Sequence, residues 1–118
     1  MMLRIDHIQL SIPKGAEEKC RPFYAGLLGL REVPKPPILA GRGGLWLESE
    51  GVKLHLGVEE DFRAARKAHP AFAVSDIDAL SLRLSEGGCE IVWDDAIPGT
   101  RRFYTSDPVG NRIEFMEA

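Results

Sequence analysis

The sequence contains few of the features that mark disulfide-rich, membrane or secreted proteins. Its two cysteines, Cys20 and Cys89, lie far apart and form no C-x-x-C pair. Cys20 falls on an apolar helical stripe, which indicates a small buried side chain. No apolar run approaches membrane-spanning length. Residues 1–6 also lack a signal-peptide pattern, so we expect a cytoplasmic protein with no membrane partner.

The sequence also lacks a strong charge of either sign. Its net charge is −3, without a basic stripe or an acidic tail, which argues against nucleic acid as a partner. The glycines of 41–44 are not followed by Lys-Ser/Thr, so a phosphate-binding P-loop is not indicated, and there is no G-x-S-x-G elbow. A length of 118 residues with 44% hydrophobic content fits a single globular domain, residues 1–118, with its own core.

What the sequence does contain is an internal repeat of strand, helix and further strands. We place module one at about residues 4–58, a connector at 59–68 and module two at 69–118. In module one, an apolar stripe predicts a helix over 17–28, although Pro22 is best tolerated in a first turn and the helix could begin later. The remaining predicted elements of module one are a strand at 5–12, a strand at 30–33, an irregular loop at 34–44, and a hairpin of 45–48 and 52–58.

Module two follows the same order. Its first strand opens at His69, because the residue before Pro70 is pushed toward extended geometry. Ser75 or Asp76 can cap the following helix, which Gly87 ends. The connector could hold a helical turn. The other predicted elements are strands at 90–93, 102–106 and 112–116, with a tight turn at 107–111.

Four potential metal ligands occupy matching points of this repeat. His7 and His69 open the two modules, and His55 and Glu114 lie in their closing strands. In each strand, two-residue alternation places the ligand opposite the bulky aliphatic side chains. We therefore expect a sheet with helices on its outer face and these four groups on its inner face, which becomes a pocket if the sheet curls.

The residue types suit a divalent metal. His7, His69 and Glu114 would leave positions on the metal open for substrate, water or oxygen. His55 is either a fourth ligand or a general base beside the metal. The donors fit zinc, iron, nickel or manganese and do not choose among them. The competing interpretation is that the histidines are structural and the chain is an interaction domain, since a single histidine on a half-buried strand more often finds another partner.

Three other residues are candidates for contacts with a substrate. Tyr104 could donate a hydrogen bond to a substrate oxygen, or it could pack in the core. Arg102 shares its strand parity and could hold an anionic group, or it could be a solvated surface residue. Trp46 could line the pocket or the core, and parity alone does not decide.

The sequence resembles the vicinal oxygen chelate superfamily, which includes glyoxalases, fosfomycin and bleomycin resistance proteins and extradiol dioxygenases. The resemblance covers nearly the whole chain, and its most specific part is the run Asp-Pro-Val-Gly-Asn-Arg-Ile-Glu at 107–114. Two further segments carry it: Asp-His-Ile-Gln-Leu at 6–10, and Phe23-Tyr24 with Leu-Gly-Leu at 28–30.

This resemblance implies an α+β fold of two βαβββ modules that form a cupped mixed sheet around a divalent metal. It implies that His7, His69 and Glu114 are the ligands and that Tyr104 contacts substrate. His55 departs from the family, because glyoxalase I relatives typically carry glutamate there. This departure argues against glutathione-dependent isomerisation.

The resemblance further implies a small-molecule substrate and a homodimer. The function it favours is that of a metal-dependent enzyme, a lyase, isomerase or dioxygenase, acting on a small oxygenated molecule. The alternative is a metal-free drug-binding protein of the bleomycin-resistance type.

Overall fold

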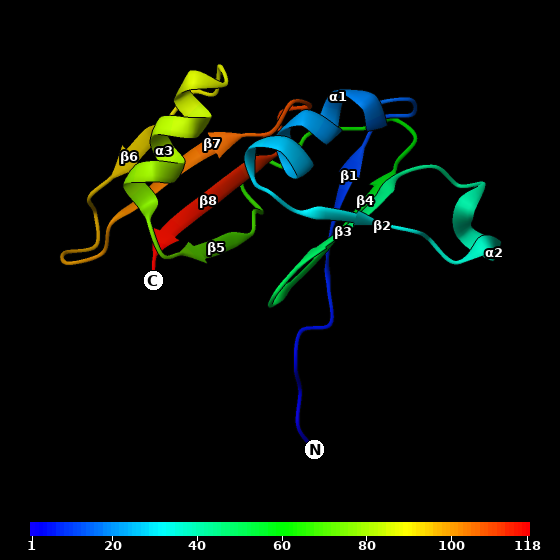
Figure 1. Ribbon diagram of the computed structural model, residues 1–118, viewed down its shortest axis with the longest axis horizontal. Helices are drawn as coiled ribbons and strands as arrows, with labels where there is room; N and C mark the ends of the chain where they lie inside the picture. Colours follow the sequence, from blue (N-terminus) through cyan, green and yellow to red (C-terminus); the bar gives the residue numbers. More distant parts are fainter. The chain divides into compact units, whose positions relative to one another are not determined.

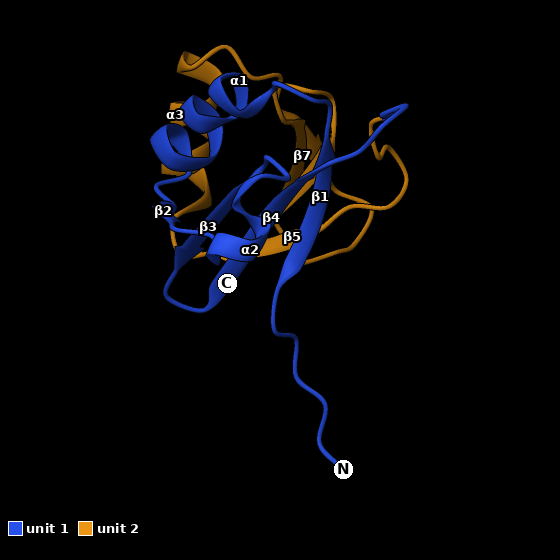
Figure 2. Cartoon of the chain, turned by 90° about the vertical axis from the view of Figure 1, so that its right-hand side faces the viewer, with its two compact units in different colours: residues 1–63 blue, residues 64–118 orange.

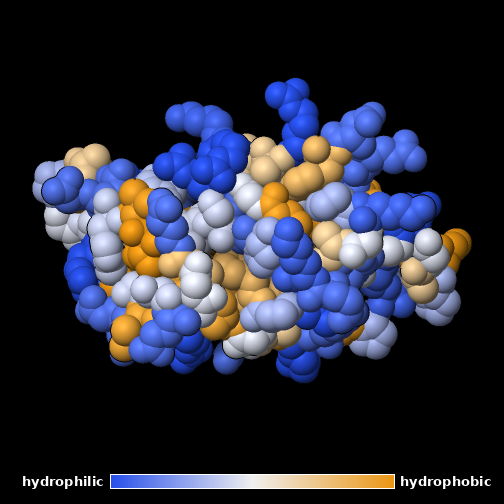
Figure 3. Space-filling view, turned by 90° about the horizontal axis from the view of Figure 1, so that it is seen from above, coloured by the Kyte–Doolittle hydropathy of each residue, from blue (hydrophilic) through white to orange (hydrophobic).

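The computed structural model describes residues 1–118 as two compact units, residues 1–63 and 64–118 (Figures 1 and 2). The boundary between the units falls inside the connector expected at 59–68. No helix has the length and apolar character needed to cross a bilayer. Most of the surface visible in Figure 3 is hydrophilic, with hydrophobic residues in small patches.

Unit 1 is a four-stranded mixed sheet with its principal helix on one face. The strand order is β1-β4-β3-β2, in which β1 runs parallel to β4 and the other pairs are antiparallel. The elements in chain order are β1 (Ile8–Ile12), α1 (Glu17–Arg21), the π-helix η1 (Pro22–Leu27), β2 (Arg31–Val33), α2 (Pro37–Ala40), β3 (Leu45–Ser49) and β4 (Val52–Val58).

The core of unit 1 lies between this sheet and the α1–η1 segment. Leu54 and Leu56 of β4 are buried, as the alternation of the strand requires. Cys20, Phe23 and Tyr24 of the helical segment are also buried, which confirms the small buried side chain predicted for Cys20. Each large apolar side chain withdrawn from water contributes about 1.5–3 kcal/mol.

Pro22 explains why the helical segment of unit 1 changes type. The helix begins at Glu17, as the apolar stripe predicts, so the suggestion of a later start is wrong. Pro22 lies at the junction instead, as the first residue of η1. Because proline has no N–H, the α-helical ladder is interrupted there. Beyond it, the Leu28 N–H donates to the Phe23 carbonyl, the five-residue spacing of a π-helix.

Unit 2 repeats the plan with strand order β5-β8-β7-β6, again with the first pair parallel. Asp76 caps the helix, and its carboxylate accepts a hydrogen bond from the Ala79 N–H at 3.0 Å. The elements are β5 (Ala71–Val74), α3 (Ile77–Glu86), β6 (Val92–Asp94), β7 (Arg102–Ser106) and β8 (Arg112–Glu117).

The core of unit 2 lies under α3. Ile77 and Leu84 of α3 are buried, as are Phe103 and Phe115 of the sheet.

A tight turn joins β7 and β8, the two long strands of unit 2. In this predicted turn, the Asp107 carboxylate accepts hydrogen bonds from the N–H groups of residues 109 and 111, at 3.0 and 2.8 Å. This turn fixes the register in which Tyr104 pairs with Glu114.

The α+β class and the two βαβββ modules are confirmed (Figure 1). In each module the buried apolar side chains of the helix and of the sheet form the core. Some boundaries differ. β1 begins at Ile8 and β5 at Ala71, so His7 lies one residue and His69 two residues before the regular strand that each was expected to open. The loop expected at 34–44 contains the short helix α2, and the connector contains turns but no helix.

Candidate metal and substrate site

In unit 1, the polar face of the sheet carries His55 at its centre. On β4, His55 is flanked across the sheet by Gln9 of β1 and Trp46 of β3. Neighbouring strands place such partners on the same side of the sheet. Trp46 therefore lies on the polar face and not in the core, which resolves the alternative that parity left open.

Three aromatic rings stack on this face. The His55 ring lies 4.2 Å from the His7 ring and 4.0 Å from the Trp46 ring, centroid to centroid. Nδ1 of His7 lies 2.9 Å from the Asp6 carboxylate. A carboxylate that holds one ring nitrogen of a histidine orients the ring and leaves the other nitrogen as a possible ligand.

His55 is buried between its two neighbours, with 8% of its surface exposed. Burial lowers the pKa of His55 below the ordinary histidine value, and the charge of nearby His7 lowers it further. His55 is therefore neutral at neutral pH and available as a proton acceptor or as a ligand.

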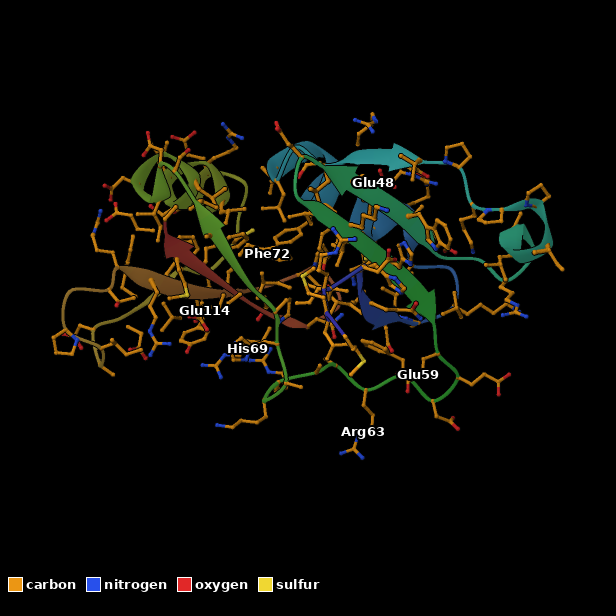
Figure 4. All side chains as sticks on the ribbon, turned by 90° about the horizontal axis from the view of Figure 1, so that it is seen from below. Glu48, Glu59, Arg63, His69, Phe72 and Glu114 are labelled. Carbon is orange, nitrogen blue, oxygen red and sulfur yellow. The ribbon has the colours of Figure 1, made fainter.

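In unit 2, His69 and Glu114 point toward one another (Figure 4). Nε2 of His69 lies 2.9 Å from Oε1 of Glu114, and Nδ1 of His69 lies 2.8 Å from the Lys67 carbonyl. Glu114 is buried, with 6% of its side chain exposed, and 21% of the His69 side chain is exposed. The two side chains thus form a defined pair at the start of β5 and the middle of β8.

The geometry of this pair fits two ligands of one metal ion. The Lys67 carbonyl can only accept, so Nδ1 carries a proton and Nε2 is left to face Glu114. A neutral imidazole would then present a lone pair to a carboxylate oxygen, which is unfavourable unless a proton or a cation lies between them. An imidazole nitrogen and a carboxylate oxygen are both donor types that a divalent metal binds, so this pair could hold such an ion.

Arg102 holds the other side of Glu114. Its Nη1 donates to Glu114 Oε2 at 3.2 Å and to the Tyr104 hydroxyl at 3.0 Å, and its Nη2 donates to Asp94 at 3.0 Å. Only 14% of the Arg102 side chain is exposed, so the interpretation of Arg102 as a solvated surface residue is wrong. Tyr104 meets His69 edge-on, with ring centroids 5.4 Å apart.

Each unit therefore contains some of the residues predicted to bind metal or substrate. Unit 1 brings His7, His55 and Trp46 together, and unit 2 brings His69, Glu114, Tyr104 and Arg102 together. Within either unit, no three histidine, cysteine, aspartate or glutamate side chains are placed to hold a metal ion.

Sequence reasoning missed the residues that support the ligands. The adjacency of Asp6 and His7 was a usable signal, because an aspartate next to a histidine can hold its ring. The contacts of Asp94 and the Lys67 carbonyl depend on register and loop path, which no local pattern reveals.

Comparison with known proteins defines the family. Residues 4–115 match the model of the Glyoxalase/Bleomycin resistance protein/Dioxygenase superfamily. The chain belongs to this superfamily, the vicinal oxygen chelate group. The sequence matches no curated protein.

Solved structures agree with this assignment. A protein described as a member of the glyoxalase family, from Bacillus anthracis, is 47% identical, with a TM-score of 0.95 over 99% of this chain and 96% of that one. The fosfomycin resistance protein FosX from Listeria monocytogenes shares the fold at 16% identity. A FosX variant in complex with Mn(II) and 1S,2S-dihydroxypropylphosphonic acid gives a TM-score of 0.81, over 100% of this chain and 94% of that one.

A third structure is lactoylglutathione lyase from Agrobacterium tumefaciens. It is 20% identical with a TM-score of 0.70, over 94% of this chain and 92% of that one. At this identity the likeness concerns the fold alone.

Proposed function

We propose that this protein is a metal-dependent enzyme acting on a small oxygenated substrate, with His7, His69 and Glu114 as ligands of a divalent ion. One observation carries the proposal. In both ligand histidines Nδ1 faces an acceptor, Asp6 for His7 and the Lys67 carbonyl for His69. This turns Nε2 to the other side, and in His69 it faces the second proposed ligand, Glu114. Histidines that only stabilise the fold have no need of this shared arrangement. The FosX complex with Mn(II) adds support from a fold relative.

The bound metal would supply Lewis acidity to a substrate oxygen. In this proposal His55 takes a proton from the substrate or from water, because burial keeps its imidazole neutral. The Tyr104 hydroxyl accepts a hydrogen bond from Arg102, which turns its own proton toward the polar face, where it donates to a substrate oxygen. Trp46 shields His55 from water on one side.

Arg102 has two proposed roles. It fixes the Glu114 carboxylate through Nη1, and it is a candidate contact for the substrate together with Trp46 and Tyr104. The alternative role for His55, as a fourth ligand, predicts loss of metal when the residue is replaced. The role as a base predicts loss of turnover with metal retained.

The experiment that tests the proposal is metal analysis of protein purified without chelator and then loaded with zinc, manganese, nickel or iron(II). We expect one ion per chain in the parent, and a loss of about tenfold or more in affinity in His7→Ala and Glu114→Gln. Lys14→Ala, an exposed change with no partner among these residues, is the control. Equal metal content in the parent and both variants would overturn the proposal.

A metal-free drug-binding protein is the second candidate. It is favoured by a pocket of unit 1 in which Trp46 and Leu39 lie beside His55 and Gln9, a mixed apolar and polar lining that suits a planar ligand. Calorimetric titration of a ligand before and after complete metal removal distinguishes a metal-dependent enzyme from a metal-free binding protein. Unchanged ligand affinity without metal would favour sequestration.

We also propose that the protein is a cytoplasmic homodimer. The superfamily resemblance motivates the dimer. Sedimentation equilibrium at micromolar concentration should then give twice the chain mass of 13.1 kDa. A monomer at that concentration would contradict the proposal.

A further inference from the structure

Unit 2 contains a second structural feature, an open pocket at the end of β7 and β8 that is lined by two arginines. Its volume is about 550 Å³, and the residues that line it are Arg66, Glu90, Val92, Tyr104, Thr105, Ser106 and Arg112. The metal-site residues His69 and Glu114 are not part of its lining, although Tyr104 touches both regions.

Arg112 presents an unused guanidinium to this pocket. Its charged group lies 3.8 Å from the centre of the Tyr104 ring, so the ring supports the cation from one side. Arg112 is half-buried and makes no ion pair in the structure. Its five N–H donors are thus available in a fork of fixed geometry, which suits a carboxylate or phosphate.

Arg66 approaches the same pocket from the connector. Its Nη1 donates to the Ser106 hydroxyl at 3.1 Å and to the Gly110 carbonyl at 2.8 Å. Both bonds use one nitrogen, which leaves donors on Nε and Nη2. The contacts hold the guanidinium in place without neutralising it, because neither acceptor carries a charge.

The charges of the lining are therefore unbalanced. The lining holds two arginines and one carboxylate, that of the exposed Glu90, and no ion pair joins Glu90 to either arginine. Asp94 lies outside the lining and close enough to Arg112 for an electrostatic interaction, but its ion pair is with Arg102. Holding two guanidinium groups beside one pocket is unfavourable by itself, and an anion between them would offset the repulsion. The Ser106 and Tyr104 hydroxyls add neutral hydrogen-bonding groups to the lining.

We infer that this pocket binds an anionic group, a carboxylate or a phosphate, held by Arg112 and Arg66. On β8, Arg112 and Glu114 lie two residues apart and on the same face, which separates them by about 7 Å along the strand. A small substrate can span this distance. The pocket then serves as the site for an acidic substituent of the substrate, a role that rests on the proposed function, whereas the binding of the anion itself does not.

Inorganic phosphate and acetate are the probes, titrated separately into metal-free protein at constant ionic strength and followed by calorimetry and by the Arg Nε–Hε signals in NMR. Metal-free protein is needed because phosphate also binds metals directly. We expect saturable millimolar binding of one or both anions. Tighter binding of phosphate identifies a phosphate-like substituent, and tighter binding of acetate identifies a carboxylate.

Matched variants locate the site. We expect Arg112→Met to lose about tenfold or more in affinity, and Arg66→Gln to lose about threefold to tenfold. Arg31→Gln, which removes the same charge at an exposed position of unit 1, should stay within about twofold of the parent. A near-ultraviolet circular dichroism spectrum checks that Arg112→Met is folded, and Arg112→Lys, which keeps a charge, should regain part of the affinity.

Two outcomes would overturn the inference: no saturable binding by the parent, or equal affinity in the parent and both arginine variants. The result is independent of metal loading. If His7→Ala and Glu114→Gln keep their metal, the proposed metal-dependent function is wrong. If the anion titration fails, only the proposal that the substrate carries an anionic substituent is wrong.

Discussion

The rings of Trp46 and His55 are parallel, with their centroids 4.0 Å apart and their planes within 2°. This contact couples a fluorescent side chain to the residue proposed as the base. A protonated imidazole quenches a neighbouring indole more strongly than a neutral one. Trp46 therefore reports the charge on His55.

We expect the fluorescence of Trp46 to fall on acidification with a midpoint below about 6.5, because burial lowers the pKa of His55. The measurement uses a Trp93→Phe variant, so that Trp46 is the remaining tryptophan of the two in the sequence. A further His55→Gln change should abolish the transition. A midpoint at or above the ordinary histidine value would contradict the burial of His55.

The same pKa shift affects stability. Because the folded state holds the proton of His55 more weakly than the unfolded state, unfolding takes up a proton between the two pKa values. The free energy of unfolding should therefore be highest above about pH 6.5 and should decrease as the pH falls toward the folded pKa. Urea denaturation at several pH values should show a shallower decrease in His55→Gln than in the parent. Equal slopes would count against the shift.

Arg102 and its neighbour Arg101 offer a matched comparison. Arg102 is mostly buried and contacts Glu114, Asp94 and Tyr104, so Arg102→Met would leave two carboxylates without their counter-charge. We expect a loss of about 2–4 kcal/mol in the free energy of unfolding. If Arg102 also positions Glu114, metal affinity should fall by about tenfold or more.

Arg101→Met is the control for this change. Arg101 pairs with Asp78 and Glu117 on the surface, where ion pairs contribute less than about 1 kcal/mol. Chemical denaturation and metal titration of both variants provide the measurement. Equal losses of stability in Arg102→Met and Arg101→Met would mean that the buried contacts of Arg102 stabilise the fold no more than a surface ion pair does.

The sequence predicts which side of the sheet each site residue takes, but it does not predict which residues lie next to it. Two-residue alternation correctly separated His55 from Leu54 and Leu56, and Glu114 from Phe115, because strand geometry alone determines which side a residue takes. The cross-strand partners of the same residues depend on register. The pairing of Trp46 with His55 followed only from the structure.

The remaining differences between the predicted and observed elements arise mainly from the backbone preferences of proline. The stripe of 17–28 predicts helical periodicity, but it does not indicate that the missing N–H of Pro22 is accommodated by a π-helix. Pro36 and Pro37 marked an irregular loop, and yet proline also suits the first turn of a helix, which is what α2 uses. The contact between Arg102 and Glu114 joins residues of two strands, and it depends on a turn that fixes their register.

Chelation should change the stability of the metal-loaded protein. A ligand that binds the native state alone, at about 100 times its Kd, adds about 2.7 kcal/mol to the free energy of unfolding. We therefore expect thermal melts with metal to lie several degrees above melts with chelator. Glu114→Gln should abolish the difference, and Glu86→Gln, an exposed change on α3, should preserve it. A difference that persists in Glu114→Gln would point to ligands other than those proposed.

Gly44 determines how the loop of 34–44 enters β3, the strand that carries Trp46. Its φ is +86°, and a Cβ at this position would lie 2.1 Å from the Leu56 carbonyl oxygen. Gly51 has a similar φ of +82° but open space around it. Gly51→Ala should therefore cost about 1 kcal/mol from backbone strain alone, and Gly44→Ala should cost about 3 kcal/mol or more because β4 would have to move. Urea unfolding of the two variants gives the difference directly, and losses of similar size would mean that the close approach to Leu56 does not constrain the loop.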